Sequence, residues 1–353
     1  GLTPYLTTSG VLVQHEPVDL VAPKLPVWFD VGTETVYPQC EGESPDSFYV
    51  RWKYGNGPPN TLSLAPQAGR FLASLPGQTA GTSIRYRVVA TAEDAQIALP
   101  DNVADDDYSV FIGETEPLYC NDFESQIDGF TFGDEKGGPG DFEWGSPFGL
   151  AGDPQLAFSG DKVLGVVLNG TGRYRSNRVT FVETPEIDLQ GHSNVRLQLR
   201  RWLTVEDGHH DQASIYVNGQ RLWQNEGTSD YDGQLHHIDK EWRFQDLDLR
   251  PFATGGTSTV KVRFELDSNG NTNLGGWNID ELCVVAWTGP PQTPPPEPGD
   301  EVADEPLGPA LSASGGCGCA TAGSARGLGL PAWLLAMATL LAARRSRATV
   351  RRD

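Results

Sequence analysis

Short apolar runs separated by glycine- and proline-rich turns are the feature that most constrains the fold of this chain. The 353 residues include 41 glycines and 26 prolines, and long runs with the 3.6-residue apolar spacing of an amphipathic helix are absent. Ile84–Ala92 alternates apolar and polar residues in its first half, as a half-buried strand does. The sequence therefore predicts an all-β protein.

The chain is strongly acidic. It has 26 Lys and Arg residues against 47 Asp and Glu residues, which gives a formal net charge of −21. Such a surface repels nucleic acid and anionic lipid headgroups and suits divalent cations, although solubility alone would also account for it. The charge therefore argues against a nucleic-acid partner and permits a cation site.

Residues 16–114 are predicted to form an immunoglobulin- or fibronectin-like sandwich, because about one hundred residues with several short strands fit that architecture. Within them, Arg70–Pro76 (RFLASLP), Gly81 and Ile84–Ala92 resemble, in order, the pattern of bacterial Ig-like modules. Residues 1–15 are interpreted as the end of an upstream unit or a linker. The strand-like runs expected in this part are Leu25–Phe29, Phe48–Tyr54, Arg70–Ala73, Ile84–Ala92 and Tyr108–Phe111.

Residues 117–288 are predicted to form a second β-sandwich. They open with Leu118–Glu124 (LYCNDFE), continue through Phe142–Pro147 (FEWGSP) and Ala157–Asp161 (AFSGD), and close with Gly276–Val285 (GWNIDELCVV). In this order these anchors resemble the MAM-like jelly rolls found near the C-termini of secreted bacterial hydrolases, such as immune-inhibitor-A-type metallopeptidases. The resemblance implies a jelly roll and spans nearly the whole segment.

The same resemblance implies a structural calcium ion in the second sandwich. In jelly rolls of this kind the first and last strands are neighbours, and the ion is held by acids of both and by the Ser-Gly loop between them. Calcium takes about six to eight oxygen ligands, which carboxylates and loop carbonyls supply. Glu281 replaces the second acid of the family's closing motif, which leaves the strength of the site open. The positions carried over to this chain are Asp122, Glu124, Asp161 and Asp280.

Two cysteines, Cys120 and Cys283, lie in those neighbouring strands, a few residues from the acids. Since export favours the oxidation of cysteine pairs, we expect a Cys120–Cys283 disulfide. Cys40 is then expected to be a free, buried thiol, because Cys317 and Cys319 belong to the C-terminal segment.

The C-terminal residues are interpreted as a tether followed by a sorting tail. Residues 289–316 are rich in proline and acidic residues and cannot bury a core, so we expect an extended, disordered stalk. The tail, residues 317–353, contains an apolar run of 17 residues, Gly327–Ala343, followed by arginines. As a helix this run would measure about 25 Å, just under the roughly 30 Å of a bilayer core. The arginines favour the cytoplasmic side.

This tail resembles the MYXO-CTERM signal of myxobacterial surface proteins, with Cys317-Gly318-Cys319, a short membrane helix and an arginine cluster in that order. The resemblance implies processing, and lipidation, near Cys317 or Cys319. A plain C-terminal membrane helix is the alternative. Either reading predicts that the preceding residues are exported and held at the cell surface. Because no signal peptide precedes Gly1, a leader or a whole upstream domain is expected to have been removed.

Motifs of catalysis are absent from the sequence: it has no His-Glu-x-x-His helix, Gly-x-Ser-x-Gly elbow, P-loop or dinucleotide fingerprint. The pairs His209-His210 and His236-His237 are interpreted as loop residues, because adjacent residues of a strand point to opposite faces. Exposed tryptophans would provide a sugar-stacking platform. Several match core positions of the jelly-roll pattern, and Trp223 alone is expected to be free to bind a ligand.

These observations favour a non-catalytic, surface-anchored protein that recognises an extracellular protein or glycan. Its other expected partners are the sorting machinery and the membrane at the tail. The alternative hypothesis is the accessory C-terminal region of a secreted hydrolase, such as a zinc metallopeptidase with its catalytic domain upstream of Gly1. A third is a passive surface-coat protein. The sequence that precedes Gly1 would distinguish the first two hypotheses.

Overall fold

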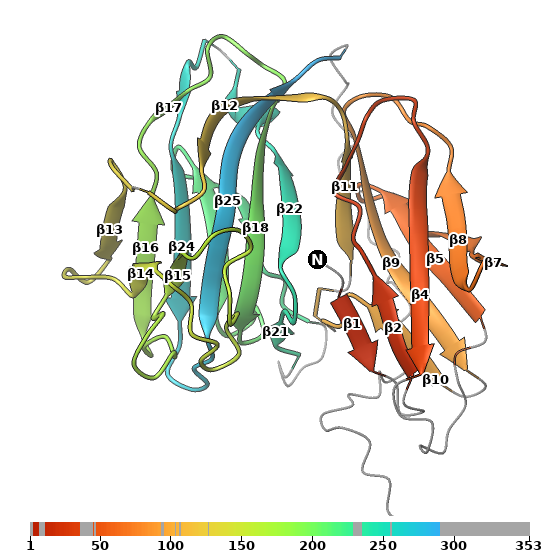
Figure 1. Cartoon of the computed structure of the whole chain (residues 1–353). Helices are drawn as coiled ribbons and strands as arrows, with labels where there is room; N and C mark the ends of the chain where they lie inside the picture. Colours follow the sequence, from red (N-terminus) through yellow and green to blue (C-terminus); the bar gives the residue numbers. More distant parts are fainter. Residues whose placement is uncertain are drawn as a thin grey trace, which may run out of the picture. The chain divides into compact units, whose positions relative to one another are not determined.

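Nearly all of the regular structure in the described residues consists of strands. The computed structural model describes residues 3–289, apart from 7–10, 36–44, 46, 93–94, 103, 106, 126, 229–234 and 255. Within these residues the strands form β-sandwiches, and one short 3-10 helix, η1 (Arg250–Phe252), accompanies them (Figure 1). The predicted all-β architecture of sandwiches is therefore confirmed.

Two sheets enclose the core of the first sandwich. One has the strand order β1-β2-β4-β8-β7, and the other β3-β11-β9-β5-β6, with β10 pairing β9. The core draws Phe29 from the first sheet and Tyr86 and Val50 from the second. The strands are β1 (Thr3–Leu6), β2 (Val11–His15), β3 (Leu20–Val21), β4 (Val27–Thr35), β5 (Ser47–Tyr54), β6 (Asn60–Ser63), β7 (Ala65–Gln67), β8 (Arg70–Leu75), β9 (Thr82–Ala92), β10 (Ala95–Leu99) and β11 (Tyr108–Ile112).

The first sandwich begins earlier than the sequence predicts. Residues 1–15 were expected to end an upstream unit, but β1 pairs with β2, and β2 pairs with β4. The physical reason is the alternation in β2, where Val11, Val13 and His15 are all buried. His15 lies in the core because its two ring nitrogens bond to Tyr86 Oη at 2.9 Å and the Asp30 carbonyl at 3.0 Å.

The second sandwich has a seven-stranded sheet opposite a five-stranded one. The larger has the order β14-β15-β25-β18-β21, with β12 pairing β25 and β22 pairing β18; the smaller has the order β13-β16-β24-β19-β20, and β17 pairs β23. Its core contains Trp277, Phe264 and Leu197. The strands are β12 (Thr115–Asn121), β13 (Thr131–Asp134), β14 (Phe142–Gly145), β15 (Val163–Val166), β16 (Arg178–Glu183), β17 (Ile187–Asp188), β18 (Val195–Val205), β19 (Gln212–Val217), β20 (Gln220–Gln224), β21 (His237–Ile238), β22 (Arg243–Asp248), β23 (Thr259–Val260), β24 (Val262–Ser268) and β25 (Gly276–Trp287).

The first and last strands of the second sandwich are neighbours, as the jelly-roll resemblance implies. In the β12–β25 pair Cys120 lies directly opposite Cys283, and the two form a disulfide with a Cα–Cα distance of 4.2 Å. The predicted Cys120–Cys283 bridge is therefore present. The Ig-like and MAM-like family assignments themselves stay predictions.

Several predictions concern residues outside the described part of the chain. These are the free thiol of Cys40, the stalk from residue 290 onward, the cysteines Cys317 and Cys319, and the apolar helix at 327–343. Among the residues that the structure describes, no helix has the length and apolar character needed to span a membrane.

Candidate ligand-binding surface

Glu124, one of the predicted calcium ligands, fastens the loop that precedes β15. Its carboxylate accepts hydrogen bonds from the backbone amides of Asp161, at 3.0 Å, and Lys162, at 2.8 Å. Lys162 also donates its ammonium to the Glu124 carbonyl at 2.9 Å. Asp122 accepts the amide hydrogen of Glu124 at 3.1 Å. The Glu124 carboxylate and the Asp161 backbone therefore lie together at this loop.

Asp280 holds the other side of the same loop. Its Oδ2 atom accepts from the backbone amides of Phe158, at 2.9 Å, and Ser159, at 3.1 Å, and its Oδ1 atom accepts from Glu281 at 2.7 Å. Burial raises the pKa of Asp280 to about 6, against the opposing effect of the amide donors. Ser159 Oγ donates to Glu281 at 2.5 Å.

These carboxylates meet amide N–H groups in the structure. Within the described ranges, no group of three or more His, Cys, Asp or Glu residues is arranged to hold a metal ion. Calcium at Asp122, Glu124, Asp161 and Asp280 thus stays a prediction. The hydrogen bonds that position the 158–162 loop go to the carboxylates of Glu124 and Asp280.

Immediately before it, residues 148–158 form a loop that exposes large apolar side chains. Phe148 is 65% exposed, Leu156 77% and Phe158 36%. The loop closes on itself, because the amide of Gly149 donates to the Pro154 carbonyl at 2.9 Å. Exposed apolar groups gathered on one loop are typical of interaction sites.

Two tryptophans attach this loop to the outward face of the larger sheet. Trp202 donates its indole N–H to the Gly152 carbonyl at 2.8 Å, and Trp242 donates to the Leu156 carbonyl at 3.1 Å. The hydroxyl of Thr204 also bonds to Gly152, at 3.2 Å. The two indole rings meet edge to face, with centroids 5.9 Å apart. These hydrogen bonds from the sheet side therefore hold the loop backbone in one conformation.

Asp153 is the third attachment of the loop, and it is buried. Asn278, on β25, donates its side-chain amide to Asp153 Oδ1 at 2.8 Å. The Asn278 Oδ1 atom is buried and has no partner among the described residues. Burial raises the pKa of Asp153 to about 7, and the hydrogen bond from Asn278 offsets this only in part. A protonated Asp153 would donate to the partnerless oxygen and complete an acid–amide pair.

Trp223 is not the exposed residue that the sequence predicts. It lies on β20 and packs against the core, with its ring centroid 5.7 Å from that of Trp277. Arg201 covers it at 5.6 Å. The exposed apolar residues of the 148–158 loop are Phe148 and Leu156. The sequence signal that could have identified them is a large apolar side chain in a segment rich in Gly and Pro that lacks the alternation of a strand.

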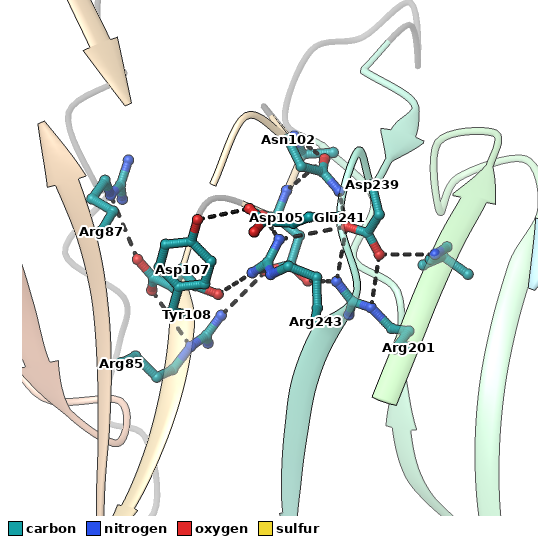
Figure 2. A network of polar contacts seen from close by, with 12 residues as sticks. Arg85, Arg87, Asn102, Asp105, Asp107, Tyr108, Arg201, Asp239, Glu241 and Arg243 are labelled. Carbon is teal, nitrogen blue, oxygen red and sulfur yellow. Dashed lines mark hydrogen bonds and ion pairs between the residues drawn. The ribbon is translucent and has the colours of Figure 1, made fainter. Parts of the chain in front are cut away.

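A buried network of charged residues joins the two sandwiches, which lie in one compact unit. Figure 2 shows Arg201 and Arg243 of the second sandwich facing Asp105 of the first. Arg201 Nη2 lies 2.7 Å from Asp105 Oδ2, and Arg201 Nε lies 3.1 Å from Asp239 Oδ2. Burial alone would raise the pKa of Asp105, but Arg201, Arg243 and Arg85 hold it well below its usual range.

Neutral and charged hydrogen bonds extend this contact. Tyr108 donates its hydroxyl to Glu241 at 2.7 Å, and Asn102 donates to Asp239 at 2.7 Å. Arg196 forms a two-pronged ion pair with Asp246 next to this region. Buried charges stay compensated only when every partner is in place, so the network stabilises the contact between the two sandwiches.

Comparisons with known proteins leave the family open. No protein-family model and no curated protein matches the chain. A solved SGBP-B from a xyloglucan utilization locus in Bacteroides uniformis is 14% identical, with 80% of each chain covered and a TM-score of 0.31. A carbohydrate-binding module of the β-sandwich superfamily is 12% identical, over 81% of this chain and all of the module, with a TM-score of 0.28.

A third solved structure is the mannan-recognising carbohydrate-binding module TmCBM27, which is 12% identical over 50% of this chain and 99% of the module, with a TM-score of 0.30. All three TM-scores lie below 0.5, so the function has to follow from this chain's own residues.

Proposed function

We propose that the chain is a non-catalytic recognition protein whose second sandwich binds a glycan through the surface of the 148–158 loop. The observation that carries this proposal is the combination of exposure and rigidity. Phe148 and Leu156 are mostly in water, while Trp202 and Trp242 hold the backbone beneath them. A surface that is ordered before the ligand arrives loses little conformational entropy on binding.

The size and chemistry of this surface favour a saccharide. Phe148 offers its phenyl ring to the apolar face of a sugar ring, and Gln155, also exposed on the loop, offers an amide to its hydroxyls. A specific protein partner would need about 800 Å² on each side, far more than three apolar side chains on one loop supply.

The place where the protein acts rests on the sequence. The stalk and the sorting tail support export and attachment at the cell surface through the C-terminus. A glycan-binding sandwich on such a tether would serve adhesion or recognition outside the cell.

A glycan array probed with the full chain tests the proposal, followed by calorimetric titration of any glycan that binds. Phe148→Ala and Leu156→Ala should each weaken binding by about tenfold or more, because burying such a side chain contributes about 1.5–3 kcal/mol. Leu25→Ala is the matched control, since Leu25 is similarly exposed but belongs to the first sandwich. An equal loss in the control, or binding only to proteins, would contradict the proposal.

A further inference from the structure

Four cations stand on one face of the first sandwich in an otherwise acidic protein. In the β5–β9 pair, Arg51 lies directly opposite Arg87, and Lys53 directly opposite Arg85. Residues in such positions have Cβ atoms about 5 Å apart, so like charges there destabilise the sheet. Strands alternate faces, and all four side chains therefore leave the sheet on the side away from its core. Two adjacent pairs of like charges, Arg51–Arg87 and Lys53–Arg85, are therefore unfavourable for the sheet itself and suggest a role in binding.

The cations line a hollow together with Trp52, Pro59 and Asp107. Asp107 Oδ2 lies 3.3 Å from Lys53 Nζ and 3.4 Å from Arg85 Nε. The same carboxylate lies 3.5 Å from Arg87, on the other side in Figure 2. These distances are longer than the roughly 2.7–3.2 Å that separates donor and acceptor in a good N–H···O hydrogen bond.

Lys53 and Arg85 therefore keep hydrogen-bond donors for another group. Their side chains are 22% and 36% exposed. Asp105, the next nearest acid, is 3.7 Å from Arg85 but 2.7 Å from Arg201, so it is engaged mainly by the second sandwich. One shared carboxylate satisfies neither the charge nor the donors of the two cations.

We propose that this hollow binds a carboxylate or sulfate group of an acidic glycan. A guanidinium fork and an ammonium group are the donors that bind such anions most strongly. Pro59 adds an apolar edge to the hollow for the sugar ring that carries the anion. The site lies on the first sandwich and goes beyond the glycan surface proposed on the 148–158 loop.

The overall charge selects this ligand over a nucleic acid. With a net charge of −21, the protein repels a dense polyanion along most of its surface. A glycan with one negative charge on a sugar residue presents that charge to the hollow without bringing a row of phosphates against the surrounding acids.

Calorimetric titration of the full chain tests the inference with an oligosaccharide that carries a single uronic acid, a monosulfated galactan oligosaccharide and their uncharged parents. The charged oligosaccharides should bind more tightly than the uncharged ones, and raising the salt from about 50 to 300 mM should weaken them. The comparison between the two charged probes distinguishes a carboxylate from a sulfate ligand.

Variants locate the effect. Lys53→Gln and Arg85→Gln should each weaken the charged oligosaccharide by about tenfold or more, as expected for loss of a charge-assisted hydrogen bond. Lys53→Arg should retain binding, and Arg221→Gln, an equal charge change on the second sandwich, should leave it unchanged. Thermal melts of each variant establish that it is folded.

The inference is overturned when neither charged probe binds, when Lys53→Gln binds as the wild type does, or when a short oligonucleotide binds equally well. Phe148→Ala and Leu156→Ala must keep the Lys53-dependent binding. Loss of glycan binding in the loop variants tests the loop proposal, and loss of charged-oligosaccharide binding in the Lys53 and Arg85 variants tests the hollow. The two proposals can therefore fail independently.

Discussion

Replacing Asp153 by asparagine should make the protein more stable at alkaline pH. Asp153 is only 6% exposed, and burial raises its pKa to about 7 from an ordinary value of 3.8. No cation pairs with it among the described residues. Asn278 is its side-chain bonding partner.

The sign follows from where the proton is held. As the pH rises through about 4, the unfolded chain loses the Asp153 proton, while the folded protein keeps it until about pH 7. The free energy of unfolding therefore falls by about 1.4 kcal/mol per pH unit in this window, or about 4 kcal/mol at most, and then levels off. The stabilising contribution is complete below pH 4 and is lost as the pH passes 7.

Asparagine has the same shape, does not titrate and donates to the partnerless Asn278 oxygen. The assay is urea unfolding of the wild type and Asp153→Asn at pH 4, 6 and 8, since acids common to both proteins, such as Asp280, cancel in the difference. The variant should gain stability relative to the wild type by up to about 4 kcal/mol between the lowest and highest pH. Asp128→Asn, at an exposed position, is the control and should show a flat difference. An equally flat difference for Asp153→Asn would refute the reasoning, because Asp153 would then be ionised throughout.

Two further predictions address the junction and the metal. Arg201→Met should lower the free energy of unfolding by about 3–5 kcal/mol, because it takes the closest cation from Asp105 and leaves Arg243 alone to pair with the buried Asp239. In the same urea titration Arg250→Met, which breaks a partly exposed pair with Asp248, should cost less than about 1 kcal/mol; equal losses would show that the network is not special. If calcium binds at the predicted site, adding it should raise the melting temperature, a chelator should lower it, and Glu124→Gln with Asp280→Asn should abolish both effects. A melting temperature indifferent to calcium and chelator removes the metal from this chain.

Local alternation made several strands predictable. The predicted runs Phe48–Tyr54 and Tyr108–Phe111 each differ from β5 and β11 by one residue at one end. They could be predicted because their pattern of apolar residues is local and needs no knowledge of the neighbouring strands. Leu25–Phe29 found only the start of β4, which continues to Thr35. The continuation contains Gly32 and polar residues, and it is a strand because β2 and β8 pair with it on both sides.

The site was less predictable because it depends on contacts across the fold. The family resemblance brought Glu124, Asp161 and Asp280 to one loop, since the order of the anchors fixes which strands are neighbours. It did not reveal that Trp202 on β18 and Trp242, just before β22, hold the 148–158 loop. It gave no sign of the junction, where Asp105 of the first sandwich pairs with Arg201 of the second, 96 residues further along the chain.

The disulfide between the first and last strands of the second sandwich has a mechanical consequence. When the chain is pulled at its two ends, tension leaving the first sandwich reaches Cys120, crosses the covalent bond to Cys283 and continues toward the C-terminus. Residues 121–282 carry none of that load. A ligand held by the 148–158 loop would therefore sit in a domain that stays folded under tension, while the strain falls on the first sandwich and on the segment after β25.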